Sequence, residues 1–191
     1  MIDRATAFIP MALLALLAAS TYWLNHIVDM EGANAPLRHD PDYIITNFTV
    51  QRFDDTGTLQ HTMIATRLTH YPDDDTSIVT APHLINHRQP VTEIFAKLAL
   101  SGKQAKQVDF VDNVRVVRQG TPDHPLETVM TTHMLTVFPD DEIGYSTTPV
   151  TITQGNSVVH GSRLDLNNKT GIAVLHGRVT GILHSQRKPS S

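Results

Sequence analysis

The stretch IITNFTVQRFDDTGTLQHTMIA, residues 44–65, decides the fold. In its first half Phe48 and Val50 alternate with polar residues, and in its second half every other residue from Leu59 to Ala65 lies on one face. A period of two residues is typical of a strand with one buried side. The Asp-Asp-Thr-Gly segment between the halves favours a turn, because Gly57 tolerates a positive φ. The stretch therefore predicts a β-hairpin.

The same alternation recurs to the end of the chain, in short runs separated by clusters of Gly, Pro, Asn and Asp. The predicted runs are 76–85, 91–100, 108–118, 126–138, 150–154, 157–166 and 172–183. None of them has the pattern of an amphipathic helix. Strands with one apolar face each must cover those faces against one another. The predicted fold class is therefore all-β: a sandwich, a jelly roll or a barrel-like trough.

The residues predicted to face inward are mostly small or β-branched, and large aromatic side chains are scarce among them. The predicted interior consists of Phe48, Val50, Leu59, Met63, Ala65, Ile94, Ala96, Val114, Val116, Leu135, Val137, Val150, Ile152 and Val159. One interpretation is a thin sandwich core of β-branched residues. The other is an apolar groove that is left partly unfilled for acyl chains. Periodicity does not separate the two.

Before this β-rich body, residues 5–24 form an uncharged apolar run, ATAFIPMALLALLAASTYWL. As a helix at ~1.5 Å per residue this run would be about 30 Å long, enough to cross a bilayer. Tyr22 and Trp23 fall where interfacial aromatic residues are expected. We predict a membrane anchor with a cytoplasmic N-terminus. A signal peptide cleaved near residues 18–20, where small residues follow the apolar core, is the alternative.

Composition fits one anchored domain. The 191 residues have a formal net charge of -4 and no cysteine, which excludes disulfide and thiol chemistry. We expect no nucleic acid as partner, because the phosphate backbone attracts basic faces. The predicted parts are the anchor helix, 1–24, a juxtamembrane linker, 25–41, the β-domain, 42–183, and a polar tail, 184–191.

Eleven histidines raise the question of a metal site. His83 and His87 have the spacing of a ligand pair on a helix, but on a strand their rings would lie about 13 Å apart at ~3.3 Å per residue, too far for one zinc ion. The acidic triplets 73–75 and 140–142 lack the spaced oxygen ligands of a calcium loop, so we interpret them as solvated turns. The sequence contains no P-loop and no nucleophile elbow. We expect no metal, no cofactor and no enzymatic activity.

Several motifs resemble the LptC family of lipopolysaccharide export proteins. They are Asp-Tyr at 42–43, Gly-x-Leu at 57–59, His-Tyr-Pro at 70–72, Asp-Thr at 75–76, Pro82, Asp-Asn-Val at 112–114, Thr-x-x-Leu at 132–135, Pro-Val at 149–150, His-Gly at 160–161, Leu-Asp at 164–165 and His-Gly-Arg-Val at 176–179. The chain departs from the family pattern at 94–96, which lacks an expected tryptophan. It also departs at Asp112, where the family usually has glycine.

This resemblance implies a twisted, trough-like β-jelly-roll domain in the periplasm, preceded by a single N-terminal transmembrane helix in the inner membrane. It implies a non-enzymatic role in a transenvelope bridge: the apolar interior receives lipopolysaccharide from the LptBFG transporter and passes it to LptA. The anchor and the N-terminal end of the β-domain would contact the transporter, and strand pairing would join neighbouring β-domains. The alternative is a membrane-tethered β-scaffold that binds protein partners only.

The last predicted strand and three glycines are assigned roles on this basis. Glycines interrupt residues 172–183 and a polar tail follows, so we predict that this strand is the edge that binds LptA. The predicted docking residues are Ile172, Val174, Val179 and Ile182. We expect Gly57, Gly161 and Gly177 at turns or bends. A second interpretation of Gly161 is that it keeps the trough open where a lipid or a partner backbone passes.

Overall fold

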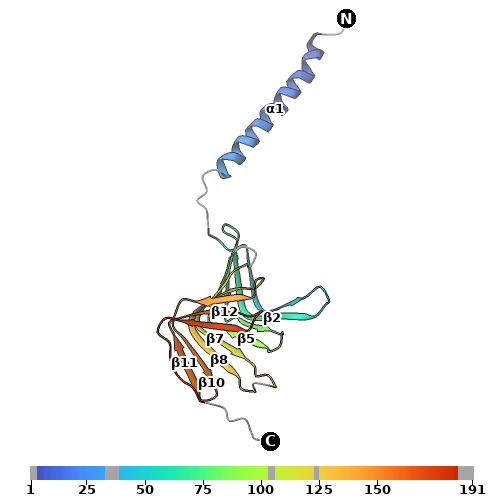
Figure 1. The fold of residues 1–191 in the computed structure, drawn as a ribbon. Coiled ribbons are helices and arrows are strands. Elements are labelled where there is room, and N and C mark those ends of the chain that lie inside the picture. Colours follow the sequence, from blue (N-terminus) through green and yellow to red (C-terminus); the bar gives the residue numbers. More distant parts are fainter. Residues whose placement is uncertain (1–3, 33–38, 103–105, 123–124, 185–191) are drawn as a thin grey trace. The chain divides into compact units, whose positions relative to one another are not determined.

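The computed structural model describes residues 4–32, 39–102, 106–122 and 125–184. In these residues one helix is followed by fourteen strands (Figure 1). The elements are α1 (Arg4–Gly32), β1 (Tyr43–Phe53), β2 (Leu59–Tyr71), β3 (Thr76–Thr80), β4 (His83–Asn86), β5 (Thr92–Phe95), β6 (Leu98–Ser101), β7 (Val108–Arg118), β8 (Thr128–Phe138), β9 (Ile143–Ser146), β10 (Val150–Gln154), β11 (Ser157–Gly161), β12 (Arg163–Asn167), β13 (Ile172–His176) and β14 (Thr180–Ile182). The helix and the strands belong to separate compact units, Met1–Arg38 and His39–Ser191.

Helix α1 contains the predicted apolar run and continues past it to Gly32. The helix therefore includes the first eight residues of the predicted linker, 25–41. The hydroxyl groups of Ser20 and Thr21 donate to the Leu17 carbonyl oxygen at 2.9 and 2.8 Å. Among the described residues, no helix is both long and apolar enough to span a membrane.

The hairpin predicted from residues 44–65 is confirmed, because β1 and β2 pair antiparallel with Val50 opposite Met63. Its turn is organised by Asp54, whose Oδ1 accepts hydrogen bonds from the backbone amides of Thr56 and Thr58, each at 2.9 Å. The Thr56 hydroxyl also donates to Oδ1, and this bond, followed by the amide bonds, holds the pKa of the Asp54 carboxyl below its usual value. Gly57 has a φ of 83°, the positive value expected for this turn.

The long strands each belong to two half-sheets. In β2, residues 61–64 pair with β4 and residues 67–71 pair with β3. In β7, residues 115–118 pair with β5 and residues 108–111 pair with β6. Half-sheet A comprises strands β4, β5, β10, β11 and β14 together with residues 48–53, 59–64, 114–118 and 128–132 of the long strands. Half-sheet B comprises strands β3, β6, β9, β12 and β13 together with residues 43–46, 67–71, 108–111 and 134–138 of the long strands.

The chain passes from one half-sheet to the other at bends that we call corners. Several corners have a residue with positive φ, among them Asn47 at 49°, Ala81 at 49° and Asp112 at 62°. Asp112 therefore adopts a conformation that glycine permits readily, and Asp is one of the few other residues that tolerate it. The corners divide the predicted runs 76–85, 91–100, 157–166 and 172–183 into two strands each. The sequence analysis also missed strand β9.

Pairing closes part of the sheet and leaves two edges open. Strands β7, β5, β4, β2, β3 and β6 form a closed ring, because β6 pairs back to β7. Among the described strands, β1 pairs only with β2, β13 only with β12 and β14 only with β11. The domain is therefore mostly β and has one open edge at its start and one at its end.

The core lies between the half-sheets. Its buried hydrophobic residues are Ala65, Val79, Ala99, Val108, Phe110, Val114, Met130, Leu135, Val150 and Leu164. Several of them that adjoin corners are small, such as Ala65, Val114 and Val150, because the two half-sheets converge there. Burial of this apolar surface joins the half-sheets into one domain.

Candidate functional site

An apolar cavity of about 480 Å³ lies between the two half-sheets. Half-sheet A contributes Met63 and Ile94 to its wall, and half-sheet B contributes Val137. Eight of the fourteen predicted interior residues line the cavity: Phe48, Val50, Met63, Ile94, Val116, Leu135, Val137 and Ile152. The structure therefore brings most of the predicted set together around one unfilled space.

The other six predicted interior residues do not line this cavity. Ala65, Val114 and Val150 are covered by protein, with exposed fractions of 4%, 1% and 1%, and Ala96 packs against the same core. The structure thus places these four residues in or against the core near the corners rather than on the cavity wall, and their contact with lipid stays a prediction. Leu59 and Val159 are half-buried and lie outside both the cavity lining and the core.

Several apolar wall residues lie outside the set predicted from the sequence. They include Leu68, Leu84, Phe110, Met130 and Leu166. Phe110 is two residues from buried Val108, and Leu166 is two residues from buried Leu164, so both share the inward face of their strands. Continuing the alternation to the end of each strand would have found them.

The open side of the cavity, where strands end in turns, is lined by polar side chains that we call the rim. The rim residues are Arg52, His61, Asn86, Thr92, Arg118, Thr128, Glu142, Asn167 and Asn168. Arg52 follows Val50 and Arg118 follows Val116 at a spacing of two residues, so both continue an apolar face. An arginine at an inward-facing position of a strand is the sequence signal that would have identified the rim.

Two ion pairs cross the rim. Arg88 in the β4–β5 turn pairs with Glu142, and Arg52 Nη2 lies 3.4 Å from Asp140 Oδ1. Both carboxylates belong to the β8–β9 turn of half-sheet B, whereas both arginines belong to half-sheet A. Burial lowers the pKa of His61, and the positive charges of Arg52 and Arg88 lower it further. The rim thus connects the two walls through side chains rather than backbone.

The predicted docking residues lie at the C-terminal edge and are exposed to solvent. The exposed fractions are 57% for Ile172, 45% for Val174, 48% for Val179 and 67% for Ile182. The prediction of one continuous strand is wrong, because the chain bends at Gly177 and Val179 falls between β13 and β14. The N-terminal edge, strand β1, is similarly exposed: the exposed fractions are 46% for Ile44 and 44% for Ile45.

Gly161 and Gly177 lie where the side chain of another residue packs closely against the glycine. A Cβ on Gly161 would lie 2.7 Å from Cδ2 of Leu175, and one on Gly177 would lie 2.8 Å from Cβ of Ser162. Gly177 also has a φ of 84°. The space beside Gly161 is therefore filled by a side chain of the same domain, which favours close packing over a passage for lipid.

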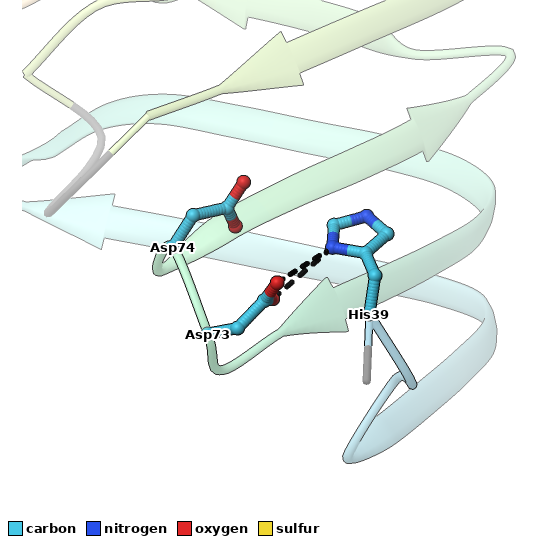
Figure 2. A group of neighbouring side chains, drawn as sticks. All are labelled: His39, Asp73 and Asp74. Atoms are coloured by element: carbon cyan, nitrogen blue, oxygen red, sulfur yellow. Dashed lines mark hydrogen bonds and ion pairs between the residues drawn. The ribbon is translucent and has the colours of Figure 1, made fainter. Parts of the chain in front are cut away.

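A histidine and an aspartate pair where the chain reaches the β-domain (Figure 2). His39 Nδ1 lies 2.9 Å from Asp73 Oδ2, and its ring stacks on Tyr71 at a centroid distance of 4.0 Å. The hydrogen bond raises the pKa of His39 and lowers that of Asp73. His39, Asp73 and Asp74 form the only group of three such side chains among the described residues whose ligand atoms lie close enough together for a metal ion. All three are exposed, and the bond between His39 and Asp73 explains their proximity.

A second pair lies beside it. His70 Nδ1 lies 2.7 Å from Asp42 Oδ1, and the His70 ring stacks on Tyr43 at 4.7 Å. The bond to Asp42 raises the pKa of His70 and lowers that of Asp42. Each pair ties a residue near the start of the domain to the end of β2 or the turn after it. These contacts are structural and hold the beginning of β1 in place.

The histidines considered for zinc have other partners. His83 Nε2 lies 2.7 Å from Glu93 Oε2, and the ring stacks on Phe95. His87 Nε2 lies 2.9 Å from the Thr62 hydroxyl. The two rings therefore serve different contacts on and beside β4.

The fold and the cavity define a class: a β-trough with an apolar interior, a polar rim and an open strand edge at each end. The family model described as "Lipopolysaccharide-assembly, LptC-related" matches residues 11–184. The chain therefore belongs to the LptC-related family, and this membership supports a role in lipopolysaccharide transport.

Comparisons with individual proteins add the following. The comparison with curated proteins found no match. Among solved structures, the chain is similar to LptH from Pseudomonas aeruginosa, described as the LptA homologous periplasmic component of the lipopolysaccharide transport device. The identity is 10%, the TM-score is 0.49, and the match covers 79% of this chain and 100% of that chain.

Proposed function

We propose that this chain is a non-enzymatic component of the transenvelope lipopolysaccharide bridge, which receives lipopolysaccharide from the LptBFG transporter and passes it to periplasmic LptA. The observation that carries the proposal is the cavity of about 480 Å³, whose walls are aliphatic and aromatic while its rim is polar. Such a lining suits acyl chains inside and a hydrophilic head group outside. Family membership supports the same assignment.

The experiment replaces Met63 or Val137 in the full chain by a photo-crosslinking residue in living cells. Both line the cavity, so illumination should attach lipopolysaccharide to the protein. The matched control is Thr131, which neighbours cavity-lining Met130 on β8 but is exposed. The protein-only scaffold predicts no lipid adduct at any site. Equal labelling at all three positions would also contradict the trough.

We further propose that residues 5–24 of α1 anchor the chain in the inner membrane, with the β-domain in the periplasm. The uncharged run and the position of Tyr22 and Trp23 support this assignment. The hydroxyl groups of Ser20 and Thr21 are satisfied by Leu17, as a bilayer requires. Intact mass measurement of the protein from carbonate-washed membranes tests it. A soluble form that begins after residue 20 would indicate a cleaved signal peptide instead.

Each open edge is proposed to bind one partner by strand addition. The transporter would bind α1 and β1, and LptA would bind β13 and β14. One-sided pairing and the exposed apolar residues of both edges support this arrangement. A photo-crosslinker at Val174 or Ile182 should capture LptA, whereas one at His133, an exposed residue of a corner, should not. Capture at neither edge residue would place the LptA contact elsewhere.

A further inference from the structure

Three arginines that lie in or next to the rim differ in their partners: Arg52 and Arg118 line the cavity, and Arg88 lies in the neighbouring β4–β5 turn. Arg52 and Arg88 each pair with a carboxylate of the β8–β9 turn. Arg118 lines the cavity, and its side chain forms no ion pair or hydrogen bond within the part of the chain that the structure describes. Arg118 is half-buried, and a guanidinium group that has no protein partner keeps its hydrogen-bond donors available for an anionic ligand.

The position of Arg118 directs its charge across the open side of the trough. It is the last residue of β7 and shares the inward face with Val116. Its Nη2 lies 3.6 Å from the point that a Cβ on Gly171 would occupy. Gly171 belongs to the turn between β12 and β13 in half-sheet B. The guanidinium group of half-sheet A thus extends to the opposite wall, where the head group of a lipid in the cavity would leave it.

Charge at the rim supports an anion rather than a neutral sugar. Among the residues that line the cavity, Arg52 and Arg118 are cationic and Glu142 is anionic, so the lining has a surplus of one positive charge. The ion pairs are also accessible, since the Arg88 side chain is 53% exposed. An arriving anion can therefore contact these guanidinium groups as well.

We propose that Arg118 binds a phosphate monoester on the head group of the amphiphile whose acyl chains occupy the cavity. This inference rests on the proposed function and adds the chemical feature that the rim selects. The planar guanidinium group donates two parallel N–H bonds to phosphate oxygens, a geometry that a carboxamide or ammonium group does not provide. Arg52 and Arg88 lie beside this phosphate and add attraction, whereas Arg118 alone has no competing carboxylate.

The test measures how tightly the purified full chain binds hexadecyl phosphate and hexadecanol, by displacement of a fluorescent alkyl probe. The unmodified chain should prefer the phosphate. Arg118→Gln should weaken binding of hexadecyl phosphate about tenfold, the effect of one charged hydrogen-bonding group, and leave hexadecanol binding unchanged. The matched control is Arg115→Gln on the same strand, whose guanidinium lies 5.8 Å from the Phe95 ring centroid and is exposed. It should change neither affinity.

Further measurements keep the inference falsifiable. In the unmodified chain, added salt should weaken binding of hexadecyl phosphate but not of hexadecanol, a result that needs no variant to fold. Arg118→Lys should retain part of the preference. An equal loss for both probes in Arg118→Gln, or no loss, would overturn the phosphate site. Displacement of the probe by inorganic phosphate at the same concentration would assign the site to free phosphate instead.

If the proposed function is wrong, the binding of the two probes to the unmodified chain differs from the result expected when only the phosphate site is wrong. An unmodified chain that binds neither alkyl probe would contradict a lipid cavity and, with it, the phosphate site. An unmodified chain that binds both probes equally would retain the lipid cavity and overturn only the phosphate site.

Discussion

The corners and the rim of the β-domain contrast, although both join the same two half-sheets. At the corners the walls converge on small, fully covered residues such as Val114 and Val150, and the polar groups there are hydrogen-bonded. At the rim the walls diverge around a cavity and are connected by exposed ion pairs. Buried packing contributes far more to stability than exposed ion pairs do. We infer that the corners hold the fold while the rim remains free to respond to a ligand.

The largest expected effect is at the corners. Leu164 lies just after the β11–β12 corner and is fully buried, so Leu164→Ala should lower the free energy of unfolding by about 2–5 kcal/mol. The control Ile172→Ala, at a side chain that is 57% exposed, should cost about 0.5 kcal/mol or less. Urea unfolding of the two variants measures both. Similar losses would show that stability is spread evenly between the corners and the edge.

A smaller loss of stability is expected when a buried hydroxyl group at a corner is removed. Thr132 Oγ1 lies 3.0 Å from Ser146 Oγ, 2.8 Å from Thr148 Oγ1 and 3.1 Å from the Pro149 carbonyl oxygen. Thr132→Val keeps the shape but removes these bonds, so the free energy of unfolding should fall by about 1–3 kcal/mol. Thr131→Val, at the exposed neighbour, should have no such effect. An unchanged urea midpoint for Thr132→Val would show that the network is dispensable.

The sequence predicted the strands better than it predicted their bends. The hairpin and β7 follow from alternation, because each has one apolar face. Strand β9 was missed because Gly144 interrupts a short run; a Cβ there would lie 3.0 Å from the Thr136 carbonyl oxygen, so close packing excludes a larger residue. At the corner that contains Ala81 this residue has a positive φ, which the conformational preferences of alanine do not predict.

The candidate site was predicted in part for the same reason. Periodicity assigns a side chain to a face but does not say where two faces converge, so Ala65 and Val114 were grouped with cavity residues although they are buried in the core. The rim does not follow from apolar periodicity, because its residues are polar. Arg118 is the last residue of β7 and lies on its inward-facing side, at the point where the apolar wall ends.

At the rim, removal of one ion pair should change access more than stability. Glu142→Gln weakens the pair with Arg88, and because the Arg88 side chain is 53% exposed the loss of stability should be below about 1 kcal/mol. The rate at which the cavity takes up an alkyl probe should rise, by about fivefold if the full 1 kcal/mol opposes opening. Stopped-flow fluorescence measures this rate, with exposed Asp141→Asn as control. A slower uptake would contradict an ion pair that restrains the rim.

The smallest expected effect is a response to pH that separates the rim from the start of β1. Burial lowers the pKa of His61, so the stability that it contributes is present above about 6.5 and is lost as the pH falls through the lowered value in the folded protein. Hydrogen bonds to carboxylates raise the pKa of His39 and of His70, so their contribution is present below about 6.5 and is lost as the pH rises through the raised values.

Acidification from pH 7 to pH 5 should therefore accelerate amide hydrogen exchange near His61, after correction for the intrinsic rates, while amides of β1 next to His70 remain protected. Raising the pH from 7 to 9 should do the reverse. The two responses have opposite signs because burial, followed by the charges of Arg52 and Arg88, lowers the pKa of His61, whereas hydrogen bonds to aspartates raise the pKa values of His39 and His70. His61→Gln should remove the acid response and leave the alkaline one. A His61 ring signal that titrates above 6.5 would instead mean that carboxylates such as Glu142 dominate the charge at the rim, and the contrast between the two regions would not hold.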